Sequence, residues 1–345
     1  MQYKNLSNTD LKVSRICLGT MTFGRQNTEQ QAFEQLDFAL AQGVNFIDTA
    51  ELYPVPTAAA TRCLTEQYIG NWIRARGNRE KLIIGTKVCG PAAMVEYLRP
   101  NIAHDEHNIR TAVEGSLKRL NTDYIDLYQL HWPDRQSNFF GQLGYEHDTS
   151  NDGTPLLETL KVLKQLVDEG KVRYVGVSNE SPWGVMSFLQ LAKQFNLPKI
   201  ASVQNAYSLL NRTTEIALAE VLYRENIDLL PYSPLGFGVL SGKYLNGALP
   251  ENSRLQLFPH YSRYQTANGV VATAQYVQLA KSLDMDPAQL AIAFVASRPF
   301  VGSTIIGATD IAQLGNAIAA IDLELDADVL AKIEAIHNAC HNPCP

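Results

Sequence analysis

The sequence predicts an α/β domain folded as a (β/α)8 TIM barrel. Two observations support this fold: eight short apolar segments recur along the chain, and amphipathic helical segments fill the gaps between them. This alternation is built either as a barrel or as a doubly wound open sheet, and a count of eight strands favours the barrel. We therefore expect residues 1–345 to form one barrel domain.

The predicted strands are short and apolar almost throughout, without a clean alternation of apolar and polar residues. This pattern is typical of parallel strands that are covered on both sides. The eight segments span residues 15–18, 45–48, 81–84, 124–128, 172–177, 200–203, 227–230 and 303–306.

The predicted helices carry apolar residues at helical spacing, and two of them end at a glycine. Gly43 follows the first helix, and Gly170 separates another helix from a strand that begins two residues later. Such short turns are usual between the helices and strands of βα units. The helical segments span residues 28–42, 62–76, 108–120, 156–169, 182–195, 212–225 and 310–320.

The remaining segments predict how the two ends of the barrel differ. Residues up to Val13 are expected to form a short hairpin that closes the bottom of the barrel. Three long connections, at 88–107, 132–155 and 234–265, follow the C-terminal ends of strands. Barrel active sites are built at that end, so we expect the functional site there.

Composition excludes several classes of protein. Hydrophobic residues make up 46% of the chain and charged residues 19%, which is typical of a folded globular protein. The net charge of −6 argues against a nucleic-acid binder. No apolar run approaches the roughly 18 residues that a membrane span needs, and the N-terminus lacks the apolar segment of a signal peptide. Five scattered cysteines indicate reduced thiols, so we expect a cytoplasmic protein.

Two familiar phosphate-binding motifs do not fit this chain, and a zinc-like spacing occurs at its end. The glycines at 236–242 have the wrong spacing for a Rossmann loop, and Gly242-Lys243 is followed by Tyr244 where a P-loop needs Ser or Thr. His337, Cys340, His341 and Cys344 have a spacing that zinc could use. They lie in the last nine residues, where chains commonly fray, so we expect a flexible tail and no metal.

Four polar residues stand at or near the ends of consecutive predicted strands. Asp48, Lys87 and His131 end the second, third and fourth strands, and Tyr53 follows in the loop after Asp48. In a barrel these strand ends converge around one axis. Taken singly, each residue also fits a structural role, namely an Asp–Lys ion pair, a surface tyrosine and a capping histidine.

Taken together, the four residues are suited to giving a proton to a carbonyl oxygen. A lysine about 4 Å from a phenol, at an effective dielectric of about 20, would attract the phenolate by about 4 kcal/mol. That would lower the phenol pKa by roughly three units. A carboxylate would keep the lysine charged, and a histidine would orient the carbonyl. No side chain supplies hydride, so such a site needs a nicotinamide cofactor.

The motifs around these residues resemble those of the aldo-keto reductases, and within that family those of the Tas-type bacterial members. The resemblance covers essentially the whole chain, and the four residues are separated by intervals of 5, 34 and 44 residues that fit the catalytic tetrad of the family. The matching segments are GVNFIDTAELY at 43–53, GTK at 85–87, DLYQLHWP at 126–133, GKVRYVGVSN at 170–179 and YSPLG at 232–236.

The resemblance implies a barrel that binds NADPH without a Rossmann fold, with Tyr53 as the general acid. It further implies that Lys87 tunes Tyr53, that Asp48 pairs with Lys87 and reaches the nicotinamide ribose, and that His131 positions the carbonyl. Other residues would hold the nicotinamide, the pyrophosphate and the ribose of the cofactor: Thr20, Ser178, Asn179, Gln204, Tyr232, Ser233, Pro234, Leu235, Gly236, Gly238, Lys243 and Gly307.

By the same resemblance, Arg254 would bind the 2′-phosphate that distinguishes NADPH from NADH, because a guanidinium matches phosphate oxygens. Thr309, Gln313 and Asn316 follow the last strand at the start of a helix, whose N-terminus also favours phosphate. Gly315 departs from the family pattern, in which many members carry a glutamate that contacts adenine.

Aromatic residues near the long connections are candidates for the substrate pocket: Trp132, Phe139, Phe140 and Trp183. The function that we expect is NADPH-dependent reduction of small aldehydes or ketones. A nicotinamide-binding regulatory subunit, like the potassium-channel β-subunits of the same family, is the alternative. A metal-dependent hydrolase is disfavoured because no His/Asp ligand cluster stands at the strand ends. The sequence predicts no nucleic-acid or membrane partner, and it leaves the oligomeric state open.

Overall fold

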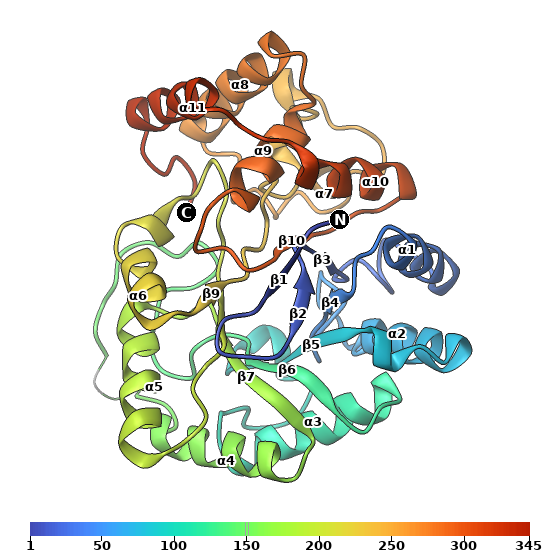
Figure 1. The fold of residues 1–345 in the computed structure, drawn as a ribbon, viewed down its shortest axis with the longest axis vertical. Coiled ribbons are helices and arrows are strands. Elements are labelled where there is room, and N and C mark those ends of the chain that lie inside the picture. Colours follow the sequence, from blue (N-terminus) through green and yellow to red (C-terminus); the bar gives the residue numbers. More distant parts are fainter. Residues whose placement is uncertain (149, 151) are drawn as a thin grey trace.

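The computed structural model describes residues 1–148, 150 and 152–345, and it confirms the predicted barrel. Its parallel strands follow the order β10-β3-β4-β5-β6-β7-β8-β9 around one sheet. Backbone hydrogen bonds then join the two edges: Leu229 N donates to Phe300 O at 2.8 Å, and Ile305 N donates to Pro231 O at 3.0 Å. The sheet therefore closes, with helices arranged around its outside (Figure 1).

Each predicted strand is present. β5 differs most from its prediction, because the apolar run at 81–84 indicates only its beginning and the strand continues through Lys87. The polar side chains of Thr86 and Lys87 hide that extension in the sequence, although both are fully buried. The barrel strands are β3 (Ile16–Gly19), β4 (Phe46–Asp48), β5 (Ile83–Val88), β6 (Ile125–Leu130), β7 (Val172–Ser178), β8 (Ser202–Gln204), β9 (Asp228–Leu229) and β10 (Thr304–Ile306).

The predicted helices are also present, with one shortened. Residues 212–225 form a 3-10 turn at Thr213–Glu215 followed by α6 (Leu218–Glu225), because the Asn211 side chain accepts from Thr213 N and makes a turn there. The others are α1 (Glu29–Ala41), α2 (Leu64–Arg76), α3 (Glu106–Leu120), α4 (Leu156–Asp168), α5 (Pro182–Phe195) and α10 (Ile311–Ala319).

Four further helices were not predicted. α9 (Pro287–Ala296) is buried on nearly all sides, so its sequence lacks the polar face that marks an amphipathic helix. α7 (Arg254–Leu257) is a single turn inside the long connection at 234–265. The remaining two, α8 (Ala267–Ser282) and α11 (Ala327–Ala339), contact each other outside the ring of strands (Figure 1).

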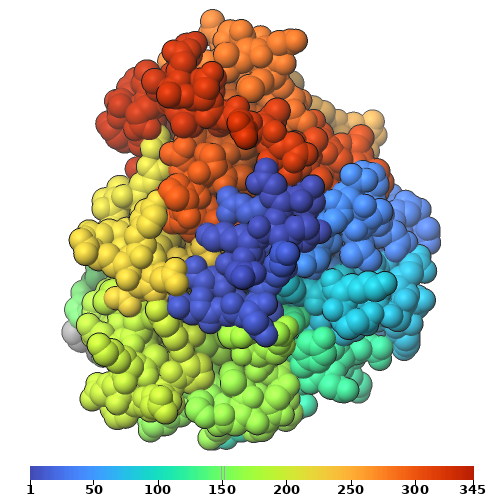
Figure 2. All heavy atoms as spheres, in the orientation of Figure 1, coloured from blue at the N-terminus to red at the C-terminus, as the bar shows by residue number. Residues whose placement is uncertain are grey.

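The predicted hairpin closes the bottom of the barrel. β1 (Tyr3–Asn5) pairs antiparallel with β2 (Lys12–Ser14), and the loop between them inserts Leu6 and Leu11 against Phe46, Leu127 and Ile305 of the barrel interior. Figure 2 shows this first segment lying across the middle of one face. The bottom is therefore plugged by side chains, and the opposite end remains for the functional site.

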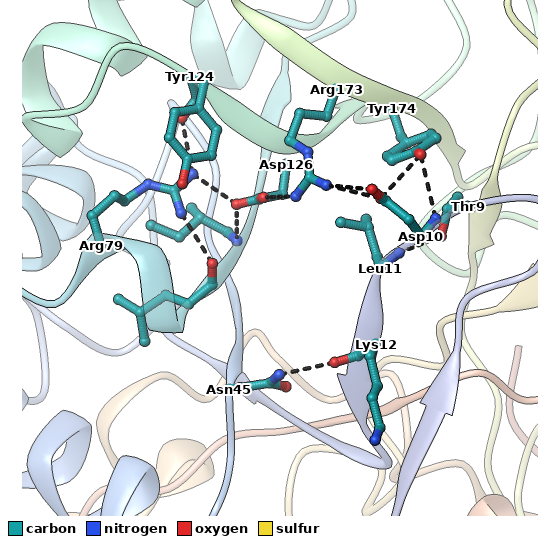
Figure 3. Close-up of polar contacts among 12 residues, drawn as sticks. Thr9, Asp10, Leu11, Lys12, Asn45, Arg79, Tyr124, Asp126, Arg173 and Tyr174 are labelled. Carbon is teal, nitrogen blue, oxygen red and sulfur yellow. Dashed lines mark hydrogen bonds and ion pairs between the residues drawn. The ribbon is translucent and has the colours of Figure 1, made fainter.

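A network of charged groups joins the hairpin to the barrel strands at this end (Figure 3). Asp126 at the start of β6 accepts from Arg79 Nη2 at 2.7 Å, from Arg173 Nη1 at 2.7 Å and from Ile84 N at 3.0 Å. Arg173 also donates to Asp10 of the hairpin loop at 2.8 Å. Asp126 is 1% exposed, so its negative charge is stabilised by these partners and not by water.

The last residues depart from the flexible tail that we expected. Cys344 is fully buried, and its backbone N–H donates to Leu210 O at 3.2 Å. Asn342 Oδ1 accepts from Arg212 N at 2.6 Å, and Pro343 O accepts from the Thr266 hydroxyl at 2.7 Å. The segment therefore packs along the outside of the barrel, where its apolar and backbone groups find partners that local sequence does not reveal.

Replacing Asp126 with Asn should lower the free energy of unfolding by about 3–5 kcal/mol, because two arginines lose a buried partner. The matched variant Asp10→Asn removes the exposed partner of Arg173 and should cost no more than about 1 kcal/mol. Urea unfolding followed by circular dichroism measures both. Equal losses in the two variants would contradict the assignment of the stabilising role to Asp126.

Candidate active site

At the open end of the barrel, Asp48 and Lys87 form a buried ion pair. Lys87 Nζ donates to Asp48 Oδ2 and to Thr49 O, each at 2.7 Å, and the two side chains are 2% and 0% exposed. Gln204 Nε2 donates to the other carboxylate oxygen of Asp48 at 2.8 Å. Buried charges are tolerated when every oxygen and proton has a partner, and these contacts provide most of them.

Tyr53 and His131 lie directly beside this ion pair. Lys87 Nζ is 5.1 Å from the centroid of the Tyr53 ring, and the Tyr53 and His131 ring centroids are 5.8 Å apart. His131 is 5% exposed, and its Nδ1 has no hydrogen-bond partner among the residues that the structure describes. The four residues that the sequence singles out are thus brought together from three strand ends and one loop.

The protonation states of this group follow from burial. Burial raises the pKa of the Tyr53 phenol well above its usual value, and the Asp48 carboxylate raises that pKa further. Burial also lowers the pKa of His131 well below its usual value, with Lys87 adding to the effect. Around neutral pH the site therefore holds a protonated phenol and a neutral imidazole.

This result corrects the expectation that Lys87 would lower the phenol pKa. The ammonium hydrogen-bonds to Asp48 and to Thr49 O, so its charge is largely offset by the carboxylate before it acts on Tyr53. Loss of water around the phenol and the negative charge of Asp48 raise its pKa, and Arg254 is the cation that acts against them. The sequence indicates which groups are neighbours but not how far each is removed from water.

A cavity of about 840 Å³ opens above Tyr53 and His131. Gly236 does not line it, because this glycine occupies a turn with φ +53° and faces Tyr264. All the other residues predicted to hold the cofactor line its wall: Thr20, Asp48, Ser178, Asn179, Gln204, Tyr232, Ser233, Pro234, Leu235, Gly238, Lys243, Arg254, Gly307, Thr309, Gln313 and Asn316.

Neutral amide and hydroxyl groups gather on one side of the cavity. Asn179 Nδ2 donates to His131 O at 2.8 Å, and Asn179 Oδ1 accepts from the Tyr232 hydroxyl at 2.6 Å. Ser178 Oγ donates to Gln204 O at 2.7 Å. Because Gln204 gives its amide protons to Asp48 and Gln129, its Oε1 is left as an acceptor. Such a wall suits a carboxamide, which both donates and accepts.

Three Lys and Arg side chains line the same cavity, and one of them, Arg263, donates to the backbone of Pro345. Neither Lys243 nor Arg254 forms an ion pair with any residue of the described part of the chain, and each lies over an aromatic ring, those of Tyr244 and Phe237, at 5.2 and 5.0 Å. Gly238 is in the left-handed region at φ +89°, and a Cβ there would lie 3.2 Å from Lys243 Nζ. Unpaired cations in a cavity are suited to binding phosphate groups.

The N-terminus of α10 offers less to a phosphate than the sequence suggests. Asp310 caps this helix, because its carboxylate accepts from Gln313 N at 2.8 Å, and Gln313 also donates its side-chain amide to Asp310. The carboxylate therefore already occupies the positive end of the helix. Gly315 faces Phe38 of α1 and does not line the cavity.

The residues predicted for the substrate pocket are only partly placed there. Trp132 is fully buried, does not line the cavity, and donates its indole N–H to Pro91 O. Trp183 is 63% exposed, has the Arg135 guanidinium over its ring, and also lies outside the cavity. Phe139 lines a smaller neighbouring cavity of about 250 Å³, and Phe140 lines both. Trp132 is thus a packing residue, since its ring stacks on Phe139.

Several lining residues near Tyr53 were not predicted. They are apolar or weakly polar, and they come from the loops after β3, β4 and β5, where no motif marks them: Met21, Leu52, Val55, Thr57 and Met94. Val55 N donates to Met21 O at 2.9 Å, which joins two of these loops beside Tyr53. The part of the cavity beside the phenol is therefore mostly apolar.

Within residues 1–148, 150 and 152–345, no group of three or more His, Cys, Asp or Glu side chains is placed to hold a metal ion. Over the same residues, the structure contains no helix with the length and apolar character needed to cross a membrane.

Comparison with known proteins agrees with the geometry. The sequence model described as the Aldo/keto reductase family matches residues 15–338. The chain is 52% identical to Protein tas of Escherichia coli, with 100% of both chains covered. It is 33% identical to the uncharacterized oxidoreductase YrpG of Bacillus subtilis and 32% identical to a probable voltage-gated potassium channel subunit beta of Arabidopsis thaliana, with 97% of this chain and 96% of the relative covered in each case.

Replacing Lys87 with Met should lower the free energy of unfolding by about 3–5 kcal/mol, because Asp48 is left buried without its cation. Adding Asp48→Asn should recover part of this loss, since the second variant removes the unpaired charge. Lys164→Met breaks an exposed pair and serves as the control, with an expected cost below about 1 kcal/mol. Urea unfolding of the four proteins checks the order, and a double variant less stable than Lys87→Met would refute it.

Proposed function

Because the chain belongs to the aldo/keto reductase family, we propose that it reduces aldehyde or ketone carbonyls to alcohols with NADPH. One observation carries the proposal: a single cavity is lined by the Tyr53 phenol, by the His131 imidazole and by two cations without acidic partners. A proton donor and a binding site for an anionic cofactor therefore share one space.

The residues present fit a nicotinamide dinucleotide. Ser178, Asn179 and Gln204 would hold the carboxamide, Tyr232 would lie against the nicotinamide ring, and Lys243 and Arg254 would meet the phosphates. The cofactor would supply the hydride when bound. Glu251, Asp286 and Asp310 also line the cavity, so the two cations are needed to make it acceptable to phosphate.

The protein's part in the reaction is to hold and deliver a proton. The carbonyl oxygen would lie between Tyr53 and His131, where the neutral imidazole donates a hydrogen bond and the phenol transfers its proton. Burial keeps that phenol protonated until a negative charge develops on the substrate oxygen. Lys87 Nζ, which is 5.1 Å from the centroid of the Tyr53 ring, would then face the phenolate, and Asp48 would hold Lys87 in place until the phenol regains a proton from water.

The substrate side of the cavity supports a small, uncharged carbonyl compound. The loop residues that line the cavity beside the phenol are Met21, Leu52, Val55, Met94 and Phe140, and none of these five carries a charge. Apolar walls with a few polar groups at the reacting end are typical of sites for small molecules.

Tyr53→Phe should lower kcat for aldehyde reduction by about 10²–10⁴-fold while NADPH binding is unchanged, because only the transferable proton is removed. The loss of absorbance at 340 nm measures turnover, and the quenching of protein fluorescence measures binding. Tyr223→Phe, which removes an exposed phenol on α6, is the control. Full turnover in Tyr53→Phe would contradict the assignment of the acid.

The same assay separates the enzyme from its alternative. Two relatives are described as probable channel β-subunits, so binding of NADPH without turnover of any carbonyl by the native chain would favour a regulatory subunit.

Arg254→Met should weaken NADPH binding by at least about 10-fold and leave NADH binding nearly unchanged, because a charge-assisted hydrogen bond to the 2′-phosphate is lost. Dissociation constants for both cofactors, measured by fluorescence titration, check this. Lys161→Met removes an exposed cation on α4 and should change neither value. An equal loss for NADH and NADPH would show that Arg254 does not read the 2′-phosphate.

A further inference from the structure

A second buried ion pair involves Glu51, which stands two residues before Tyr53 in the chain. Glu51 stands between Asp48 and Tyr53 in the chain, and its side chain is 4% exposed. Glu51 Oε2 accepts from Arg99 Nη1 at 2.6 Å, and Oε1 accepts from Arg99 Nη2 at 3.0 Å. Arg99 comes from the connection after β5 and is 10% exposed. We refer to these two residues as the Glu51–Arg99 clamp.

The clamp sits where the chain leaves the barrel to form the turn that carries Tyr53. After β4 ends at Asp48, the backbone still follows β5: Thr49 N donates to Gly85 O at 2.8 Å, and Glu51 N donates to Lys87 O at 3.2 Å. The chain then turns away, with Tyr53 N donating to Ala50 O at 3.1 Å. The pairing with β5 therefore stops within two residues of the phenol.

The carboxylate of Glu51 continues this pairing where the backbone cannot. Oε1 of Glu51 accepts from Cys89 N at 2.8 Å. This side-chain oxygen takes the place of the backbone carbonyl that would accept the next hydrogen bond if the pairing between β4 and β5 continued. Cys89 is fully buried, and its N–H would otherwise lack a partner. The start of the Tyr53 turn is thus attached to β5 on both sides of Lys87.

Arg99 secures the carboxylate from the other side. Its Nε donates to Asn108 Oδ1 at 2.8 Å, and Asn108 in the first turn of α3 donates its amide to Asn101 O at 2.9 Å. The guanidinium therefore joins the Tyr53 turn, the end of β5 and the start of α3. A bidentate pair between planar groups fixes orientation as well as distance.

We propose that the Glu51–Arg99 clamp is a positioning element for the general acid, which sets the place of the Tyr53 hydroxyl relative to Lys87 and His131. The proposal rests on the proposed function, because it concerns the geometry of proton transfer. Neither residue lines the cavity, so the clamp acts through the turn and not by touching substrate or cofactor. A misplacement of about 1 Å in such a site costs about 10²-fold in rate.

Arg99→Met should lower kcat by about 10- to 100-fold, while the dissociation constant for NADPH changes by less than about twofold. Arg99→Lys should recover part of kcat, because an ammonium keeps the charge and one hydrogen bond but not the bidentate geometry. The double variant Glu51→Gln/Arg99→Met should be no slower than Arg99→Met, since both residues belong to one clamp.

A second buried pair provides the matched control. Arg119 Nε donates to Glu66 Oε2 at 2.7 Å, and Glu66 Oε1 accepts from the Thr86 hydroxyl at 2.6 Å on the outer side of β5. This pair contacts β5 next to Lys87 but has no hydrogen bond to the Tyr53 turn within the described residues. Arg119→Met should lower stability like Arg99→Met and leave kcat within about threefold of the native value.

Amide hydrogen exchange of residues 49–56 gives a readout that is independent of turnover. Exchange in this turn should rise in Arg99→Met and stay native in Arg119→Met. Native kcat and native exchange in a folded Arg99→Met would overturn the proposal, as would an equal fall of kcat in Arg119→Met. Absence of turnover in the native chain would reject the proposed function alone, because the exchange measurement still decides whether the clamp holds the turn.

Discussion

The buried pair of Asp48 and Lys87 is the interaction on which the rest of the open end depends. Both charges lie almost completely out of water, so each must keep its partners. Those partners extend outward: Thr49 O binds the ammonium, and Gln204 binds the carboxylate from the opposite side of the barrel. Strands β4, β5 and β8 are therefore held in one arrangement by a single pair of charges.

The neutral amide groups of the cavity wall depend little on the long connections, whereas the cations Lys243 and Arg254 both come from the connection at 234–265. Asn179 is held by the backbone of His131 and by Tyr232, and Gln204 is held by Asp48 and Gln129. Each is fixed by groups at the strand ends. The apolar lining beside Tyr53 comes from the loops that follow the strands, and Tyr53 itself stands in one of these loops between Leu52 and Val55, so one segment holds both the phenol and part of the apolar wall.

The strands and the four central residues could be predicted because their signals are local or lie in recognisable motifs. Lys87 was placed correctly although β5 extends beyond its apolar run, since the motif at 85–87 identifies it. The sequence predicts a lowered pKa for the Tyr53 phenol, whereas in the structure that pKa is raised. Burial is a property of the whole barrel and not of the residues near Tyr53 in the chain. The packing role of Trp132, helix α9 and the docking of residues 342–345 could not be predicted for the same reason: each depends on contacts with segments far away in sequence.

The hairpin at the bottom of the barrel has a consequence for when its contacts can form during folding. Its residues precede the barrel in the chain, yet Lys4 pairs with Asp228 at 2.6 Å and the Gln2 side chain donates to Ile321 O at 3.0 Å. These two contacts can form only after Asp228 and Ile321 have been synthesised. Full burial of Leu6 and Leu11 likewise requires Ile305 of the last strand, so the plug is completed only when both ends of the barrel sheet are present.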